Sequence, residues 1–201
     1  MSDIMINLVF EDSLSGSVLS KLLAHSHRHY VVGHRYDAGG FGWIKKKIDG
    51  FNHAAKGMPY LVLTDLDRHK CPPILIEEWL STTRHPNLVF RVAVREVEAW
   101  LLACRDSFAA FLGVPPNRIP LNVEEITNPK EFVVNLARRS RKKNVRVDIA
   151  PAPASTAKVG PDYNGRLVYY VENLWDPSVA KENSPSLRKA IEALEVFRPA
   201  S

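Results

Sequence analysis

The segment YLVLTDLD, residues 60–67, places a short apolar run directly before two aspartates. A continuous apolar run of this length, rich in β-forming side chains, is typical of a strand that is covered on both faces of a sheet. Asp65 and Asp67 then lie where the strand leaves the sheet. Residues two apart on an extended chain point to the same side, so both carboxylates could reach one point. The segment therefore predicts a buried strand with a pair of carboxylates at its end.

The strand-like pattern recurs through the first half of the chain and alternates with segments whose apolar residues have helical spacing. The strand-like segments are residues 3–10, 30–36, 60–67 and 87–94, and the helix-like segments are residues 15–26, 41–57, 72–83 and 97–114. Alternation of this kind indicates βαβ units. We therefore predict an α/β fold, with a mostly parallel sheet of about four strands flanked by helices.

The second half has a different pattern. Residues 113–132 form a proline-rich connection, and residues 148–161 are rich in proline, alanine and small polar residues, which is typical of a loop. Helical spacing returns in residues 128–140, 161–175 and 184–197. We predict that residues 1–104 form the α/β core and that residues 105–201 form a C-terminal extension of helices and loops packed on it.

The composition is that of an ordinary globular protein, with 45% hydrophobic and 24% charged residues in 201. No stretch of about 18 or more apolar residues could span a membrane. The first residues lack the basic leader of a secretory signal, and Cys71 and Cys104 form no CxxC pattern. We expect a cytoplasmic protein without a membrane partner, and the sequence leaves its oligomeric state open.

The formal net charge of +5 favours an acidic partner, of which nucleic acid is the commonest. Much of the excess lies in RRSRKKNVR, residues 138–146, which is either a solvated helix end or a phosphate-contacting patch that we expect near the acidic edge of the sheet. Other candidate phosphate contacts could equally be solvated surface. The candidate nucleic-acid-binding residues are Lys70, Arg95, Arg138, Arg139, Arg141, Lys142, Lys143 and Lys158.

Acidic residues follow three of the predicted strands. They are Glu11 and Asp12 after the first strand, Asp65 and Asp67 after the third, and Glu96 and Glu98 after the fourth. Ligands of parallel α/β sheets bind beyond the carboxyl ends of the strands, so these side chains should gather at one edge. Converging carboxylates repel one another unless a cation lies between them, and hard oxygen ligands suit Mg²⁺ or Mn²⁺. The pattern therefore predicts a divalent metal site.

Structural roles are alternatives for each of these acids. Asp65 could cap the next helix, and Asp67 could pair with Arg68 or Lys70 at the surface. The roles of Glu96 and Glu98 depend on where the following helix begins. If the chain is still extended they share a side, whereas in a helix they lie about 200° apart and only one can face the site.

A glutamate after the first strand and a DxD after a later one resemble the Toprim domain of topoisomerases, primases, RNA-maturation nucleases and overcoming-lysogenization-defect nucleases. REVEAWLLA (residues 95–103), GPDYNGRL (residues 160–167) and SPSLRKAIEAL (residues 184–194) resemble the small stand-alone Toprim-like proteins of prokaryotes, some of which are encoded beside ATPases. The Toprim likeness covers about residues 4–104, and the likeness to the small proteins covers nearly the whole chain.

The resemblance implies a nuclease that needs Mg²⁺ or Mn²⁺, with Asp65 and Asp67 as metal ligands and Glu11 as a further metal ligand or proton carrier. Asp12 stands where family members commonly have glycine, which favours a noncatalytic role, whereas the three retained acids favour catalysis. The function expected first is cleavage of DNA or RNA, in phage defence or a mobile-element system. The alternatives are a noncatalytic subunit that binds nucleic acid or a partner ATPase, and a hydrolase of small phosphate esters.

Overall fold

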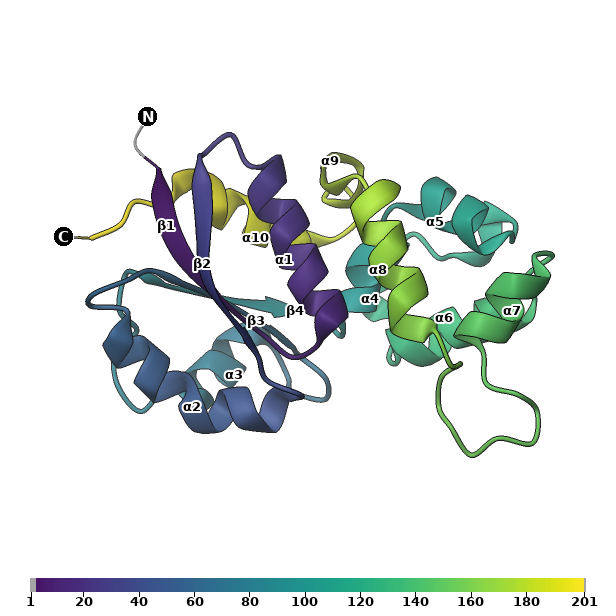
Figure 1. Ribbon diagram of the computed structural model, residues 1–201, viewed down its shortest axis with the longest axis horizontal. Helices are drawn as coiled ribbons and strands as arrows, with labels where there is room; N and C mark the ends of the chain where they lie inside the picture. Colours follow the sequence, from purple (N-terminus) through teal and green to yellow (C-terminus); the bar gives the residue numbers. More distant parts are fainter. Residues whose placement is uncertain (1–2, 201) are drawn as a thin grey trace.

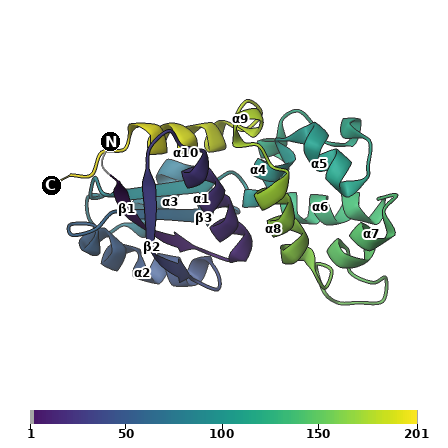
Figure 2. The ribbon, with the colours of Figure 1, turned by 45° about the horizontal axis from the view of Figure 1, so that its top comes forward.

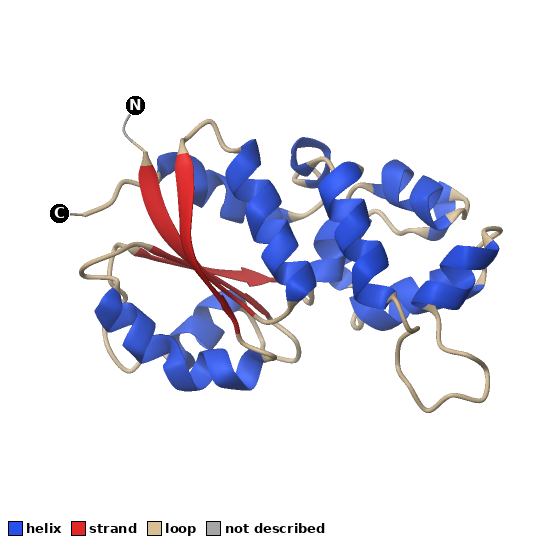
Figure 3. Cartoon of the chain, in the orientation of Figure 1, coloured by secondary structure: helices blue, strands red, loops and turns tan. Residues whose placement is uncertain are grey.

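The structure, a computed structural model, describes residues 3–200 and is built around one four-stranded sheet (Figure 1). All four strands are parallel and lie in the order β2-β1-β3-β4. They are β1 (Ile4–Phe10), β2 (Tyr30–Asp37), β3 (Tyr60–Asp65) and β4 (Leu88–Ala93). Helices cover the sheet and continue beyond it (Figure 3). The predicted α/β fold with a parallel sheet is confirmed.

The central strand β3 is apolar on both faces because the sheet is covered on both sides. Leu61 and Leu63 pack with one hydrophobic cluster, and Tyr60 and Val62 pack with another on the opposite face. This explains why the strand is a continuous apolar run instead of an alternating one. The strand β2 lies at the edge of the sheet, and most of its residues are exposed.

Two helices cover each face of the sheet. On one face lie α1 (Ser13–His25) and α10 (Pro185–Val196), and on the other lie α2 (Phe41–Ala54) and α3 (Pro72–Trp79) (Figure 2). The helix α1 begins at Asp12, whose side chain accepts a hydrogen bond from the Ser15 N–H at 2.9 Å. Such a cap satisfies one of the unpaired N–H groups at a helix start.

The remaining helices gather beyond the carboxyl end of β4 (Figure 1). They are α4 (Val97–Leu102), α5 (Arg105–Leu112), α6 (Pro129–Arg138), α7 (Lys143–Ile149), α8 (Tyr163–Asn173) and α9 (Pro177–Ala180), with the 3₁₀ turns η1 (Pro116–Arg118) and η2 (Val123–Glu125). Within residues 3–200 no helix is both long enough and apolar enough to cross a membrane.

The helix predicted over residues 97–114 is wrong in one respect, because the structure divides it into α4 and α5. Cys104 adopts φ −86° and ψ 62°, which lies outside the helical region. The side-chain amide of Asn183 donates to the Ala103 carbonyl at 2.9 Å. A contact with a residue far along the chain thus accompanies the break.

The C-terminal half of the chain also contributes to the α/β core. The helix α8 packs against α1, and α10 packs against β4. Buried residues from both halves belong to one hydrophobic cluster. A boundary at residue 104 stays a prediction, but the helices that follow it cover part of the sheet.

Candidate functional site

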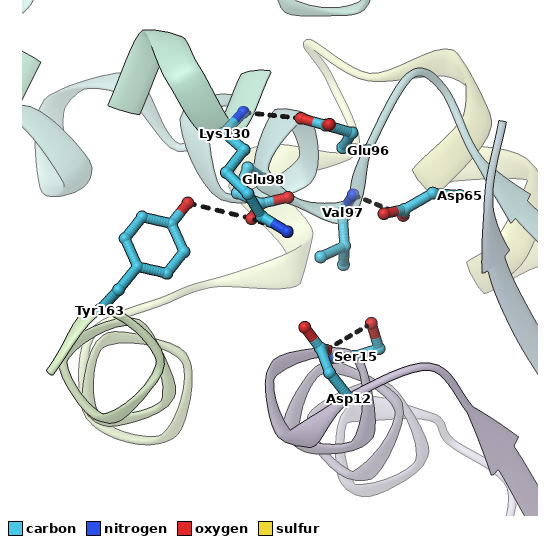
Figure 4. A network of polar contacts seen from close by, with 8 residues as sticks. All are labelled: Asp12, Ser15, Asp65, Glu96, Val97, Glu98, Lys130 and Tyr163. Carbon is cyan, nitrogen blue, oxygen red and sulfur yellow. Dashed lines mark hydrogen bonds and ion pairs between the residues drawn. The ribbon is translucent and has the colours of Figure 1, made fainter. Parts of the chain in front are cut away.

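The candidate site lies where β1, β3 and β4 end. Because the strands are parallel, their carboxyl ends meet at one edge of the sheet. Glu11 directly follows β1, Asp65 is the last residue of β3, and Glu96 and Glu98 lie at the start of α4. Figure 4 shows Asp65, Glu96 and Glu98 together with side chains from α1, α6 and α8.

Asp65 is turned toward the start of α4. Its Oδ1 accepts a hydrogen bond from the Val97 N–H at 2.8 Å. Burial raises the pKa of Asp65 well above its ordinary value, and the charges of Glu98 and Glu11 raise it further. Asp65 therefore caps α4. The alternative interpretation, in which Asp65 caps the next helix along the chain, is wrong, because that helix is α3. The helix α3 begins after Cys71, which makes no side-chain cap.

Glu11 is tied to the end of β3. Its Oε1 accepts hydrogen bonds from the Thr64 hydroxyl and from the Asp65 N–H, the latter at 3.0 Å. Burial raises the pKa of Glu11, these two hydrogen bonds oppose the shift, and the charges of Asp67 and Asp12 add to it. Both hydrogen bonds use Oε1, so Oε2 remains available for a ligand.

Asp67 lies beyond the strand in a left-handed conformation, with φ 48°. Its N–H donates to the Arg95 carbonyl at 2.9 Å, which continues the pairing of β3 with β4. Within residues 3–200 its carboxylate makes no hydrogen bond or ion pair, so the alternative pairing with Arg68 or Lys70 is not observed. An unpartnered carboxylate at this edge is free to bind a ligand.

Glu96 and Glu98 lie on either side of the start of α4. Glu96 precedes the helix and is extended, while Glu98 is in its first turn. Glu96 Oε2 accepts a hydrogen bond from the Lys130 backbone N–H at 2.6 Å. Glu98 Oε1 accepts from the Tyr163 hydroxyl at 3.0 Å and lies 3.5 Å from Lys130 Nζ. Both glutamates therefore face α6, although one lies outside the helix and the other within it.

Glu98 is the most deeply buried of these acids, with 1% of its surface exposed. Burial raises its pKa, and the charge of Lys130 opposes that shift. Its Oε2 is buried without a hydrogen-bond partner among the described residues. A buried polar atom without a partner costs free energy and often marks a place where a ligand binds.

Lys130, near the start of α6, is the functional residue that sequence reasoning missed. Burial lowers its pKa, but the charges of Glu98, Asp65 and Asp12 outweigh that effect and raise it. Lys130 is therefore a permanent cation within a group of carboxylates (Figure 4). In the sequence, the segment N-P-K indicates only that a helix starts near Lys130. It does not indicate which acidic side chains Lys130 contacts.

Asp12 is compatible with the path of the chain at the position where the Toprim resemblance predicts glycine. Its φ of −153° lies in the extended region, which any residue can adopt. Its carboxylate is occupied by capping α1, where the N–H and the hydroxyl of Ser15 both donate to it. Replacement of glycine by aspartate therefore introduces no backbone strain here.

Two hollows flank the acids. A groove of about 1140 Å³ is lined by Asp67 and Glu96 and also by Arg68, Arg95 and Lys158. A smaller hollow of about 470 Å³ is lined by Glu11, Asp12, Ser13, Asp37, Gly39, Gly40, Lys130 and Asn164.

The predicted phosphate contacts near the groove differ in availability. The Arg95 Nη1 donates to the carbonyls of Asp67 and His69 at 3.1 and 3.0 Å, so this guanidinium mainly holds the loop after β3. Lys158 is exposed and lines the groove. Lys70 is exposed but is not among the lining residues of either hollow. Lys158 is thus the better placed of the three to contact a bound phosphate.

The basic segment that follows α6 does not lie at the acidic edge, and this expectation is wrong. Lys130 begins α6, whereas Arg138 ends it, eight residues later. A helix rises about 1.5 Å per residue, so the two ends are about 12 Å apart. Arg138, Arg139, Arg141, Lys142 and Lys143 line neither hollow. They therefore form a separate surface.

The donor chemistry of the acidic edge fits a hard divalent cation. All the acidic side chains offer oxygen atoms, which Mg²⁺ and Mn²⁺ prefer. In the part of the chain that the structure describes, the Asp67 carboxylate and Glu98 Oε2 have no hydrogen-bond partner. Among residues 3–200, however, no group of three or more Asp, Glu, His or Cys side chains is arranged to hold a metal ion. These residues fit a cation bound by one or two carboxylates and completed by water and substrate oxygens.

Comparison with known proteins adds no family to this description. No family model, no curated protein and no solved structure matches the chain. The likeness to the Toprim domain therefore rests on the sequence motifs alone and stays a prediction. The function has to be argued from the site.

Proposed function

We propose that the protein is a divalent-metal-dependent nuclease that cleaves phosphodiester bonds in DNA or RNA. The proposal is carried by one observation, the excess of carboxylates at the carboxyl edge of the sheet around the ammonium group of Lys130. Burial and mutual repulsion raise the pKa values of Asp65, Glu98 and Glu11. Such an arrangement is costly for folding and is typical of a site that binds a cation or moves protons.

Asp67 and Glu11 are the residues that would hold the metal, with Asp65 beside them. Among the described residues, one carboxylate oxygen of Glu11 and the whole Asp67 carboxylate make no hydrogen bond or ion pair. When bound, a divalent cation supplies positive charge for the phosphate oxygens and lowers the pKa of a bound water. Asp65 positions the start of α4, which carries Glu98.

Lys130 supplies a fixed positive charge that does not depend on metal. Its ammonium lies 3.5 Å from Glu98 Oε1 and borders the smaller hollow together with Glu11. A cation held in place stabilises the negative charge that develops on a phosphoryl group during cleavage. Because its pKa is raised, Lys130 acts by charge and is not a proton acceptor near neutral pH.

The groove favours a polymer over a small phosphate ester. It has a volume of about 1140 Å³, and its lining includes the basic side chains of Arg68, Arg95 and Lys158 as well as the acidic side chains of Asp67, Glu96, Glu124 and Glu125. The formal net charge of +5 also suits a polyanion. We also propose a cytoplasmic location. The Toprim likeness adds a role in phage defence or beside a partner ATPase to the same proposal.

The experiment compares the wild type with Asp67→Asn. Labelled single- and double-stranded DNA and RNA are incubated with Mg²⁺, Mn²⁺ or chelator. Asp67 is the best position to change, because its carboxylate makes no hydrogen bond or ion pair among the described residues and the fold does not depend on it. We expect cleavage that needs metal and that falls at least about 100-fold in Asp67→Asn.

Glu77→Gln is the matched control, because Glu77 is an exposed acid on α3 away from the site. It should cleave like the wild type. Hydrolysis of small phosphate esters without cleavage of polymers would replace the proposal by the phosphoesterase alternative. Binding of nucleic acid by a folded protein that cleaves nothing under any condition would replace it by the noncatalytic subunit.

A further inference from the structure

The junction between α6 and α7 carries five exposed basic residues. Lys142 bonds to the end of α5, and we call the other four, Arg138, Arg139, Arg141 and Lys143, the α6–α7 basic surface. Arg138 donates to the side chain of Asn135 within its own helix. Within residues 3–200, Arg139, Arg141 and Lys143 make no side-chain hydrogen bond or ion pair. Three neighbouring cations are therefore available to an external anion.

The backbone below these side chains is held firmly. The Ser140 hydroxyl donates to the Leu112 carbonyl and accepts from the Lys142 N–H at 2.9 Å. The Lys142 ammonium donates to the carbonyls of Ala110 and Phe111 at 2.8 and 3.1 Å, at the end of α5. The Lys142 ammonium therefore binds the end of α5, whereas the side chains of Arg139, Arg141 and Lys143 are exposed to solvent.

Folding explains part of this charge, because Arg138 lies in the last turn of α6 and Arg139 follows it, where the partial negative charge of the helix end favours cations. It does not explain Arg141 and Lys143. Lys143 is the first residue of α7, and the preceding Lys142 provides no side-chain cap. The start of a helix carries a partial positive charge, so cations there are unfavourable. Acidic residues or a serine cap would stabilise this helix better. The positive charge that Arg141 and Lys143 add at the start of α7 therefore suits a partner more than it suits the fold.

The α6–α7 basic surface is also separated from the acidic edge by the length of α6. Lys130 and Arg138 are about 12 Å apart along the helix axis. One phosphate cannot contact both ends. In a duplex, base pairs rise about 3.4 Å each, so about four base pairs are needed to cover this distance.

We propose that the α6–α7 basic surface is a second nucleic-acid-binding site, which holds phosphates of a polymer whose other part lies at the acidic edge. The substrate class is then a nucleic-acid polymer that spans this distance, which for a duplex means more than about four base pairs, and not a free nucleotide. The inference deepens the proposed function and rests on it for the role of the acidic edge. Binding at the α6–α7 basic surface itself does not require cleavage.

The test measures binding of a labelled duplex of about 30 base pairs in chelator across a series of salt concentrations. The variant is Arg139→Gln, Arg141→Gln and Lys143→Gln, which leaves Ser140 and Lys142 in place. The control, Lys45→Gln, Lys46→Gln and Lys47→Gln, removes the same charge from an exposed face of α2. Both lower the formal net charge from +5 by three.

We expect the first variant to bind the duplex at least about tenfold more weakly, with a log–log salt slope smaller by about 3, since each phosphate contact contributes about 0.9. The α2 control should keep the affinity and slope of the wild type. Arg139→Lys with Arg141→Lys should bind like the wild type, because the charge remains. Unfolding midpoints of all variants should agree, which excludes loss of fold as the cause.

The inference is overturned if the Gln variant binds like the wild type, if both triple variants weaken equally, or if the wild type binds no duplex. These results are independent of the cleavage test. If Asp67→Asn loses cleavage and the Gln variant binds normally, the nuclease proposal is supported and the second binding site is rejected. If the wild type cleaves nothing and the Gln variant binds more weakly, the second binding site is supported and the nuclease proposal is rejected.

Discussion

The carboxyl group of Asp65 is held in surroundings that favour its neutral form. Burial and the charges of Glu98 and Glu11 raise its pKa well above the ordinary value of 3.8. The folded protein therefore binds this proton more tightly than the unfolded chain does. Stability from this group is fully present below pH 3.8 and is lost as the pH rises through the raised pKa of the folded state. At neutral pH, above the ordinary value, this group opposes folding.

We predict that Asp65→Asn stabilises the protein at neutral pH when metal is removed. The side-chain carbonyl can still accept from the Val97 N–H, while the repelled charge is gone. The free energy of unfolding should rise by about 1 kcal/mol or more, which moves the midpoint up by about 2–4 °C in a protein of this size. Thermal unfolding in chelator at a series of pH values measures this difference, which should shrink toward pH 3.8.

Asp65→Ala provides the contrast. It removes the same charge but leaves the Val97 N–H without its acceptor, which costs about 1–3 kcal/mol. Its midpoint should therefore lie below that of Asp65→Asn at every pH. An Asn variant that is less stable than the wild type at neutral pH would show that the negative charge of Asp65 is not repelled in the folded protein.

At the scale of elements, α8 supports the site through one buried side chain. The Tyr163 hydroxyl donates to Glu98 Oε1 at 3.0 Å, and Tyr163 is 3% exposed. Burial raises the pKa of Tyr163, and the charge of Glu98 raises it further. The hydroxyl therefore keeps its proton and stays a donor. We predict that Tyr163→Phe lowers the free energy of unfolding by about 1.5–3 kcal/mol, the usual worth of a hydrogen bond to a charged group. Urea unfolding would measure the loss.

Tyr169→Phe is the control, since Tyr169 lies on the same helix and is exposed. It should unfold like the wild type within about 0.5 kcal/mol. Equal unfolding of the two variants would mean that the hydrogen bond to Glu98 contributes nothing to stability.

The elements differ in how far their residues can be predicted from the sequence. Residues 60–64 indicate a strand because a covered parallel strand needs apolar side chains on both faces. The placement of Glu11 and Asp65 at one edge follows from strand polarity alone. Lys130 and Tyr163 could not be predicted as partners of Glu98, because only the packing of α6 and α8 brings them there. The end of α4 is likewise accompanied by a contact with Asn183 that no local pattern contains.

At the scale of the whole molecule, the site is assembled from both halves of the chain. The strands supply Glu11, Asp65 and Asp67, while α6 and α8 supply Lys130 and Tyr163. The same dependence holds for the core, since the Trp100 indole donates to the Ser186 hydroxyl at 2.7 Å. A change in the packing of the helices beyond β4 would therefore alter the charge balance at the acidic edge.

This dependence predicts that residues 1–104 do not fold alone. Without residues 105–201, one face of the sheet loses α10, and α1 loses α8. The N–H of Ala200 donates to Asn87 Oδ1 at 2.7 Å, so even the end of the described chain is tied to the residue before β4. Burial of apolar surface contributes about 25 cal/mol per Å², and a fragment exposing a whole sheet face loses much of this term.

The measurement is circular dichroism with heating of the 1–104 fragment beside the full chain. We expect a cooperative transition for the full chain and none for the fragment, which should aggregate through its uncovered sheet face. Adding residues 105–201 as a separate chain should restore part of the transition if both halves form one core. A fragment with its own sharp transition would instead make residues 1–104 an independent domain, and the helices beyond β4 would then serve the acidic edge without being needed for the fold of the sheet.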